Sequence, residues 1–190
     1  MSEVLVPFIN CLLVLDGDGD RIIAKYYDKR SKSDQSRFEL TLHKKTKNLS
    51  FRSDAEIILL DHELVVIKGS SDCRIIISGS VDENELVLVN VLDAIHDTVL
   101  ALLRGQLDKR TMLDNLELVL LTIDEVIDNG QIMELDASAV ASRVLMKGSA
   151  ESSMGGGSMS NPGNTGGDMT ISQALGLARN QFIKSLTSGN

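Results

Sequence analysis

The first apolar stretch of the chain predicts a β-hairpin. Residues 8–15 form a continuous run of β-favouring side chains, and residues 21–27 form a second run. Residues 16–20 separate them and read Asp-Gly-Asp-Gly-Asp, and Asp-Gly steps supply the positive φ angles of tight hairpin turns. Because the first run shows no alternation of apolar and polar residues, we expect a strand that is covered on both faces.

Three more strands and a helix are predicted between residues 33 and 78. Apolar side chains recur at helical spacing over 33–51, where Ser33 or Asp34 can cap the start of the helix. Strands are expected at 56–60, 64–68 and 73–78. The links between these strands are too short for a parallel crossover, which needs about a dozen residues, so the neighbours must pair antiparallel. The predicted sheet is therefore a five-stranded meander with one helix inserted after its second strand.

Residues 84–104 predict a helix that is apolar over most of its surface. Its polar side chains form only a narrow stripe, and Gly105 follows its end. Such a helix needs burial on more than one side. We therefore expect part of it to face another protein, and the residues assigned to that contact are Leu88, Leu92, Ile95 and Val99.

Two further helices are predicted to close the body of the protein. The first begins at a capping pair, Thr111 and Asp114, and ends at Asn129-Gly130. Its inner face is expected to consist of Leu113, Leu116, Leu120, Ile123 and Ile127, and its acidic outer face of Asp114, Glu117, Asp124, Glu125 and Asp128. The second helix is short and covers residues 136–146.

The last part of the chain has a different composition. Residues 148–167 contain seven Gly and five Ser, too little apolar surface to offset the entropy of ordering, so the sequence predicts a body at 1–147 and a flexible linker at 148–168. An amphipathic helix is expected within 169–190. Because a lone helix of this length is marginal in water, it should bind a partner, a membrane surface or the body itself. The residues on its apolar face, assigned to such a contact, are Ile171, Leu175, Phe182 and Leu186.

Charge is distributed unevenly along the chain. The sequence has 19 Lys and Arg and 27 Asp and Glu, for a net charge of −8, with four Phe, two Tyr and no Trp. An acidic chain with so few aromatic side chains is unsuited to nucleic acid, so no nucleic-acid partner is expected. Between residues 29 and 52, however, eight basic residues stand against two acidic ones, which gives +6 there and leaves −14 elsewhere. This stretch is either a solvated helix face or a contact surface for an acidic partner or an anionic membrane.

The local sequence offers no catalytic residue, metal site or cofactor site. Cys11 and Cys73 lie far apart, which is typical of a protein in a reducing compartment. Residues 16–20 imitate the start of a calcium loop, but Arg21 and Tyr27 occupy the positions that an EF-hand gives to Gly and Glu. Phosphate-binding loops and nucleophile elbows are also missing. No apolar run approaches the roughly 18 residues of a membrane span, so we expect a cytosolic protein.

The order of the predicted elements, two strands, a helix, three strands and then helices, resembles the longin-like small chains of vesicle-coat adaptor complexes. Residues 116–136 carry this resemblance most clearly, with a helix that contains Asp124-Glu125 and is followed by a glycine and an extended piece. Other stretches resemble the zeta branch of the family, which belongs to coatomer, the COPI coat. These stretches are residues 16–28, 83–86, 109–111, 170–175 and 181–186.

The sigma branch of the same family fits less well. It carries an aromatic and basic block across the fourth and fifth strands, where this chain has Leu-Val-Val-Ile-Lys at 64–68 and Arg-Ile-Ile-Ile at 74–77. The resemblance therefore favours zeta, and no cargo-binding residues are assigned. It implies an α+β fold, an α/β sandwich, whose five-stranded antiparallel sheet has one helix on one face and two or more C-terminal helices on the other.

The resemblance also implies a function. A zeta chain is a non-catalytic subunit without a cofactor that pairs with the coatomer gamma subunit, in whose trunk it is cradled. It would share one complex with the alpha, beta, beta-prime, delta and epsilon subunits, and an Arf-family GTPase would recruit this coat. It would be found in the cytoplasm, at the cytoplasmic side of the Golgi membrane and on COPI-coated vesicles, where it supports Golgi-to-ER retrograde and intra-Golgi transport.

Two other functions stay open at the level of sequence. The first is a longin-like subunit of another adaptor, tethering or GTPase-regulating complex, which would have the same fold and a different partner. The second is a small enzyme or ligand-binding domain built on a similar sheet. It would need a pocket with convergent polar groups, which the sequence does not indicate.

Overall fold

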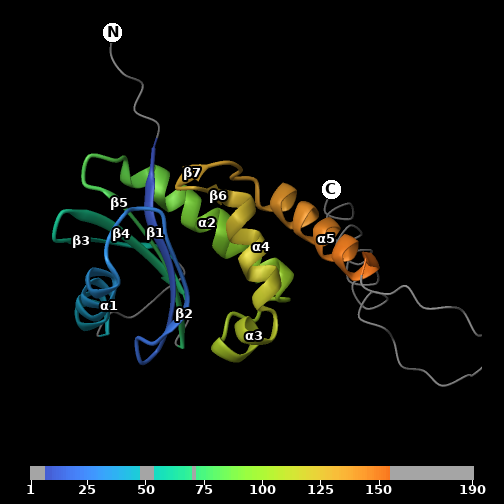
Figure 1. Cartoon of the computed structure of the whole chain (residues 1–190), viewed down its shortest axis with the longest axis horizontal. Coiled ribbons are helices and arrows are strands. Elements are labelled where there is room, and N and C mark those ends of the chain that lie inside the picture. The colour runs from blue at the N-terminus through green and yellow to red at the C-terminus, as the bar shows by residue number, and fades with distance from the viewer. Residues whose placement is uncertain (1–6, 48–53, 70–71, 155–190) are drawn as a thin grey trace, which may run out of the picture. The chain divides into compact units, whose positions relative to one another are not determined.

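The computed structural model describes residues 7–47, 54–69 and 72–154, with side chains up to residue 146. A five-stranded antiparallel sheet has helices on both faces, as Figure 1 shows. Its strands are β1 (Ile9–Asp16), β2 (Arg21–Tyr26), β3 (Glu56–Leu60), β4 (Glu63–Gly69) and β5 (Cys73–Ser80). The helices are α1 (Lys32–Thr46), α2 (Glu85–Leu102), α3 (Lys109–Asp114), α4 (Leu116–Val126) and α5 (Ala137–Met154), and a small ribbon consists of β6 (Ile127–Asp128) and β7 (Gln131–Ile132).

The strands follow the order β2-β1-β5-β4-β3 across the sheet. The predicted hairpin of β1 and β2 and the antiparallel pairing of β3, β4 and β5 are confirmed, but the simple meander is wrong. β1 lies at the centre and pairs with β5, so the chain passes from one edge of the sheet to the other between β2 and β3. Every residue of β1 except Asn10 is buried. So apolar a strand is most stable at the centre of the sheet, where it has a neighbouring strand on each side.

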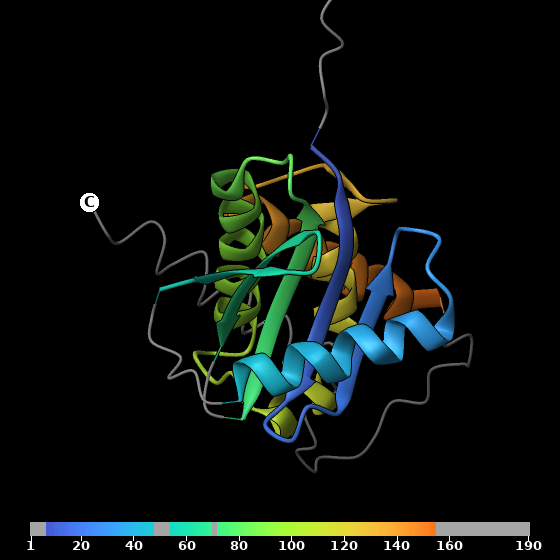
Figure 2. The same ribbon diagram turned by 90° about the vertical axis from the view of Figure 1, so that its left-hand side faces the viewer.

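α1 covers one face of the sheet and lies across its strands, as Figure 2 shows. Its inner side chains pack on a core cluster drawn from four of the strands. That cluster consists of Cys11, Leu13, Leu15, Phe38, Leu42, Leu60, Val65, Ile67 and Ile76. The helix begins at Lys32, one residue earlier than expected, and its cap is Ser31 and not Ser33 or Asp34: the Ser31 hydroxyl accepts a hydrogen bond from the backbone N–H of Asp34. The predicted end of this helix, beyond residue 47, lies outside the described residues.

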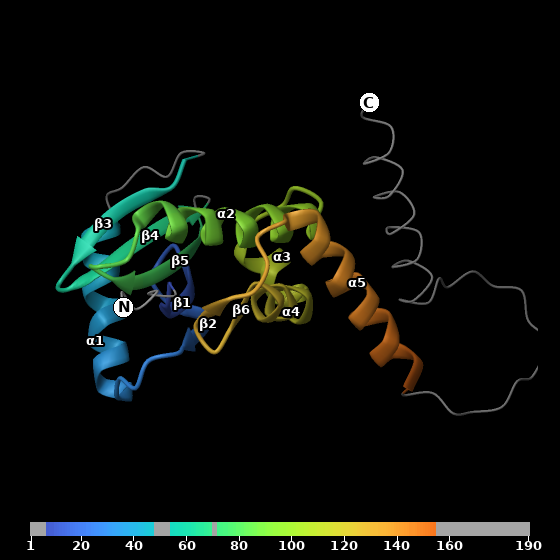
Figure 3. The ribbon, with the colours of Figure 1, turned by 90° about the horizontal axis from the view of Figure 1, so that it is seen from above.

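α2 covers the opposite face, where it packs on β4, β5 and α4 (Figure 3). The side chain of Asn84 caps its start by accepting a hydrogen bond from the N–H of Leu86. Its end is marked by Arg104 and Gly105, which both adopt positive φ angles. The predicted helix over 84–104 is therefore confirmed to within two residues.

The single helix predicted after α2 is wrong, because the structure has two. α3 starts at a cap made by Asp108, whose carboxylate accepts hydrogen bonds from the N–H and hydroxyl of Thr111, and the expected Thr111 cap is not formed. Asn115 is not helical, so the predicted helix is interrupted there before α4 begins. α4 buries Val119, Thr122, Ile123 and Val126, whereas Leu113, assigned to the inner face, is 47% exposed. Of the acidic residues assigned to the outer face, Asp114, Glu117, Asp124 and Asp128 are exposed, whereas Glu125 is half-buried.

Residues 127–132 form a ribbon and not the end of a helix. Its turn, Asn129-Gly130, has positive φ at both residues, as tight hairpins require. The ribbon is held to the sheet, since the N–H of Ile9 donates to the carbonyl of Gly130 at 2.8 Å and Phe8 pairs with Gln131. The main chain then enters α5, whose start the carboxylate of Asp136 caps.

The chain divides into two units, residues 1–141 and 142–190, and the sheet and the helices α1 to α4 belong to the first. α5 continues to Met154 and so enters the range expected to be linker. The rest of the predicted linker, residues 155–168, and the predicted helix within 169–190 lie outside the described residues.

Candidate partner-binding surfaces

The contact residues predicted on α2 are not on the surface. Leu88, Leu92 and Val99 are 0% exposed and Ile95 is 1% exposed, because these side chains face the sheet and the neighbouring helix. Their assignment to a partner is corrected, since the apolar character of α2 is accounted for by burial on two sides within the chain. The other four assigned residues, Ile171, Leu175, Phe182 and Leu186, lie outside the part that the structure describes.

Three exposed apolar side chains lie on the edge strand β3 and in the first turn of α2. Ile57 and Leu59 on β3 are 43% and 57% exposed. Ile58, between them, packs on the cluster beneath α1, so the alternation of a strand turns its two neighbours to the α2 side of the sheet. Leu86, in the first turn of α2, is 63% exposed. We call Ile57, Leu59 and Leu86 the β3–α2 patch.

The two parts of the patch lie toward the same end of the sheet. Leu60 pairs with Glu63, and Glu63 pairs with Ser80, from which the chain turns into α2. At the border of the patch, Lys68 on β4 forms an ion pair of 2.6 Å with Asp93 on α2. An apolar centre with a polar rim is the usual anatomy of a protein–protein interface.

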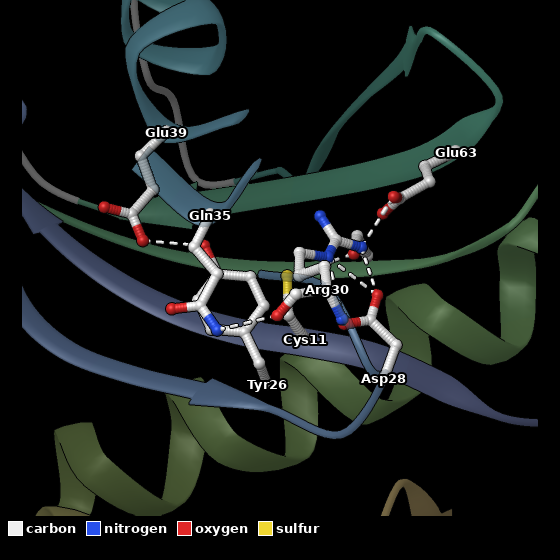
Figure 4. Close-up of polar contacts among 8 residues, drawn as sticks. Cys11, Tyr26, Asp28, Arg30, Gln35, Glu39 and Glu63 are labelled. Atoms are coloured by element: carbon white, nitrogen blue, oxygen red, sulfur yellow. Dashed lines mark hydrogen bonds and ion pairs between the residues drawn. The ribbon is translucent and has the colours of Figure 1, made fainter. Parts of the chain in front are cut away.

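A network of polar side chains around Arg30 ties α1 to the sheet (Figure 4). Arg30 Nη2 lies 2.6 Å from Glu63 Oε1, and Arg30 also forms an ion pair with Asp28. Its guanidinium carbon lies 4.7 Å from the centre of the Phe38 ring and 5.2 Å from that of Tyr26. Burial alone would lower the pKa of Arg30, but the hydrogen bond to Asp28 and the charge of Glu63 raise it above its usual range.

A second part of this network joins α1 to β2. The Tyr26 hydroxyl donates to Glu39 Oε1 at 2.6 Å, and Arg21 Nη2 lies 2.6 Å from the same oxygen. Burial, together with this hydrogen bond, raises the pKa of Tyr26. Glu39 is thus turned toward the sheet, as Figure 4 shows, and the network fixes the position of the helix.

Two open hollows flank α1, but neither is a shaped ligand site. The first, of about 400 Å³, is lined by Arg30, Arg37, Phe38 and Thr41 together with four carboxylates, and the second, of about 430 Å³, lies beside Arg21 and Glu39. The carboxylates around the first are Asp28, Asp34, Asp61 and Glu63. Three of these, Asp28, Asp34 and Glu63, are paired with the arginines Arg30 and Arg37, so the hollow serves the attachment of α1.

The predicted turn at 16–20 is stabilised from within the chain. Asp16 is 2% exposed, and its carboxylate accepts hydrogen bonds from the backbone N–H groups of Asp18 and Asp20 and from Lys109 Nζ at 2.6 Å. Burial raises its pKa, but these hydrogen bonds outweigh burial and hold the pKa below its usual range. The calcium-like spacing therefore serves a hairpin turn, as the sequence indicated.

The cysteines are packing residues. Cys11 and Cys73 are both fully buried, and burial raises the pKa of each thiol to about 12. Cys11 Sγ lies 3.1 Å from the Ser78 hydroxyl. Since the thiolate is the reactive form, these thiols are unsuited to nucleophilic or metal chemistry at neutral pH. Among the described residues, no group of acidic, His and Cys side chains could hold a metal ion, and no helix has the length and apolar character of a membrane span.

Comparison with known proteins assigns the chain to a family. A family model for the clathrin adaptor complex small chain matches residues 8–151. The chain belongs to the clathrin adaptor complex small-chain family. This small chain is 36% identical over 184 residues to coatomer subunit zeta-1 of Arabidopsis thaliana, and the match covers 96% of the chain and 98% of the relative. It is 41% identical over 142 residues to coatomer subunit zeta-1 of Homo sapiens, covering 74% and 78%.

A structure of an adaptor complex shows the same fold. A chain in a homology model of the full-length AP-3 complex in a stretched open conformation matches with a TM-score of 0.59 at 12% identity, covering 77% of the small chain and 96% of that chain. The small chain therefore has the longin-like α+β fold of adaptor small subunits, as the resemblance implied.

Sequence reasoning missed both the Arg30 network and the exposed residues of β3. It did not single out Arg30, because an arginine in a basic stretch carries no sign of its partners, Asp28 and Glu63. It also missed Ile57 and Leu59. The signal was present, since β3 reads Glu-Ile-Ile-Leu-Leu and is apolar on both faces although it lies at an edge.

Proposed function

We propose that the small chain is the zeta subunit of a COPI coat, a non-catalytic assembly subunit that pairs with the gamma large subunit. The observation that carries this proposal is the similarity to coatomer zeta subunits along 96% of the chain. It would act in one complex with the other coatomer subunits, recruited by an Arf-family GTPase to the cytoplasmic side of the Golgi membrane. There it would support Golgi-to-ER retrograde and intra-Golgi transport.

The β3–α2 patch is the surface that we assign to the gamma subunit. An edge strand with exposed apolar side chains is a liability for a chain that stays alone, because it pairs and aggregates. Ile57, Leu59 and Leu86 would instead be covered by the helices of a large partner, with Lys68 and Asp93 at the border. This assignment replaces the four buried residues of α2.

Capture of candidate large chains tests the proposal. The tagged full chain is co-expressed in turn with the gamma subunit of coatomer and with the corresponding large chains of other adaptor complexes. We expect gamma to be retained and the others to be lost in the wash. Retention of another large chain, and not of gamma, would assign the protein to a different complex.

Two variants locate the contact surface. Leu59→Glu places a charge in the β3–α2 patch and should weaken gamma capture about tenfold or more, since a buried anchor of an interface contributes on the order of 2 kcal/mol. Leu40→Glu makes the same change at a side chain that is 56% exposed on α1, on the other face of the sheet, and should leave capture intact. Equal loss in both variants would contradict the assigned surface.

A further inference from the structure

The outer face of α1 carries a row of cations around one exposed leucine. Arg37, Leu40, Lys44 and Lys47 are spaced by three or four residues, so they lie along one side of the helix over a length of about 15 Å. We call these four residues the α1 basic face. It is opposite to the side of the helix that Phe38, Leu42 and Thr46 bury.

Little negative charge balances these cations. Asp34 forms an ion pair with Arg37 at 2.6 Å, yet the Arg37 side chain is still 77% exposed. Glu39, the other carboxylate of α1, is turned inward to Tyr26 and Arg21. In the part of the chain that the structure describes, no ion pair involves Lys44 or Lys47.

Exposed acidic side chains also lie on the side of the sheet away from α1. α1 lies on one face, and the acidic outer residues of α3 and α4 belong to the helical layer on the other (Figures 1 and 2). These residues are Asp114, Glu117 and Asp124, all of them exposed; Asp114 lies 3.8 Å from Arg110, and Asp124 forms an ion pair with Lys25. A surface of negative charge would attract the α1 side and repel the other side, which would orient the molecule.

The shape of the region favours a flat anionic surface over an acidic protein. The hollow that flanks the helix has four carboxylates, Asp28, Asp34, Asp61 and Glu63, against two arginines, so it offers an acidic peptide no net positive charge. A bilayer would touch only the crest of the helix, where the lysines and Leu40 stand out. There the lipid headgroups contact the cations. Leu40, which is 56% exposed, can enter the boundary between the headgroups and the acyl chains.

We propose that the α1 basic face binds the surface of a membrane that contains anionic phospholipid. The contact is peripheral and electrostatic, with Arg37, Lys44 and Lys47 on the headgroups and Leu40 inserted between them. It does not depend on which large chain binds the β3–α2 patch, because the two surfaces lie on opposite faces of the sheet.

Co-sedimentation of the full chain with vesicles tests this proposal. With phosphatidylcholine vesicles that contain about 30 mol% phosphatidylserine we expect binding, and with phosphatidylcholine alone we expect little. Raising the salt from about 0.1 M to about 0.5 M should release the protein, because screening removes the attraction. Equal binding to both kinds of vesicle would overturn the proposal.

Matched variants place the contact on α1. A lysine near an anionic surface contributes roughly fivefold in affinity, so Lys44→Gln with Lys47→Gln should weaken binding on the order of 30-fold. Arg104→Gln with Arg110→Gln makes the same change of charge at exposed positions beyond α2 and on α3, and should weaken binding far less. An equal loss of vesicle binding in both double variants would show that only the net charge of the protein matters, and it would overturn the assignment to α1.

Two more measurements separate the remaining outcomes. Capture on an immobilised glutamate-rich peptide, without vesicle binding, would overturn the membrane proposal in favour of an acidic protein partner. The vesicle and capture experiments are also independent: Leu59→Glu should bind vesicles normally, and Lys44→Gln with Lys47→Gln should capture the gamma subunit normally. Failure of one proposal is thereby distinguished from failure of the other.

Discussion

At the scale of single residues, Arg30 joins three elements through one guanidinium. It contacts Asp28 after β2, Glu63 at the start of β4 and the Phe38 ring on α1, and its side chain is only 12% exposed. Arg30→Met would keep much of the volume but leave two carboxylates without their cation. We expect a loss of about 2 kcal/mol in the free energy of unfolding, measured by urea denaturation.

Conservative replacement separates charge from geometry at this position. Arg30→Lys keeps the charge but lacks the planar fork that reaches both carboxylates and stacks on the ring, so its stability should fall between wild type and Arg30→Met. Lys29→Met removes one charge at the neighbouring exposed residue and should change the free energy of unfolding by less than about 0.5 kcal/mol. Equal effects of Arg30→Met and Lys29→Met would show that the network contributes nothing.

Asp16 makes the stability depend on pH. Its pKa in the folded protein lies below the usual 3.8, so its carboxylate stabilises the fold at neutral pH and this contribution is lost as the pH falls through the folded pKa. Asp16→Asn should therefore cost about 1–3 kcal/mol at pH 7, and the difference from wild type should shrink as the pH falls from 5 toward 3. Denaturation curves recorded across this range measure both quantities.

A neighbouring residue gives the control for Asp16. Asp18 lies in the same turn but is exposed, so Asp18→Asn should change the free energy of unfolding at pH 7 by less than about 0.5 kcal/mol. A difference between wild type and Asp16→Asn that stays constant with pH would mean that the carboxylate is not ionised in its bonds to Lys109 and to the turn.

The residue scale is also where sequence reasoning succeeded least. Leu88, Leu92, Ile95 and Val99 were correctly recognised as apolar, but the sequence does not show whether a sheet of the same chain or a second protein buries them. Burial of α2 on two sides became evident only when β4, β5 and α4 were placed around it. The same limit applied to Asp108, whose role as a cap depends on where the main chain turns.

At the scale of elements, the ribbon of β6 and β7 depends on a glycine that touches the sheet. Gly130 has a φ of +83°, and an added Cβ would lie 2.5 Å from ring carbons of Phe8 and 2.9 Å from the carbonyl oxygen of Ile9. Gly130→Ala should cost more than backbone strain alone, at least about 2 kcal/mol in the free energy of unfolding.

Gly105 provides a matched comparison for this ribbon. Its φ is +82°, almost the same, but nothing lies within 4 Å of an added Cβ, so Gly105→Ala should cost only about 1–2 kcal/mol of backbone strain. Adding Phe8→Ala to Gly130→Ala should recover part of the loss by removing the clash. Equal stability of the two single alanine variants would show that the contact with Phe8 is unimportant.

The sequence predicted well which strands and helices form, but it did not predict the order of the strands in the sheet. Every strand of the sheet and the cores of α1 and α2 follow from apolar periodicity and turn residues, because these signals are local. The position of β1 between β2 and β5 is not local, since a helix as long as α1 can carry the chain to either edge of the sheet. The break at Asn115 was missed because the residues on both sides favour helix.

At the scale of the whole molecule, the described fold should stand without the last residues of the chain. The sheet, α1 and the helices α2 to α4 all lie between residues 9 and 126. A chain that ends at residue 154 should therefore unfold cooperatively, with a free energy of unfolding within about 0.5 kcal/mol of the full chain. Loss of cooperative unfolding would place part of the segment 155–190 in the core.

The central place of β1 has a consequence for how the protein is made. β1 leaves the ribosome first, but Leu12 lies opposite Ile77 on β5, so the middle of the sheet cannot close until that distant strand has also emerged. Contacts so remote in sequence slow folding, because a long loop must be ordered before they form. During synthesis the apolar strand β1 is therefore exposed on the nascent chain. We expect chaperones to bind it until β5 has been synthesised.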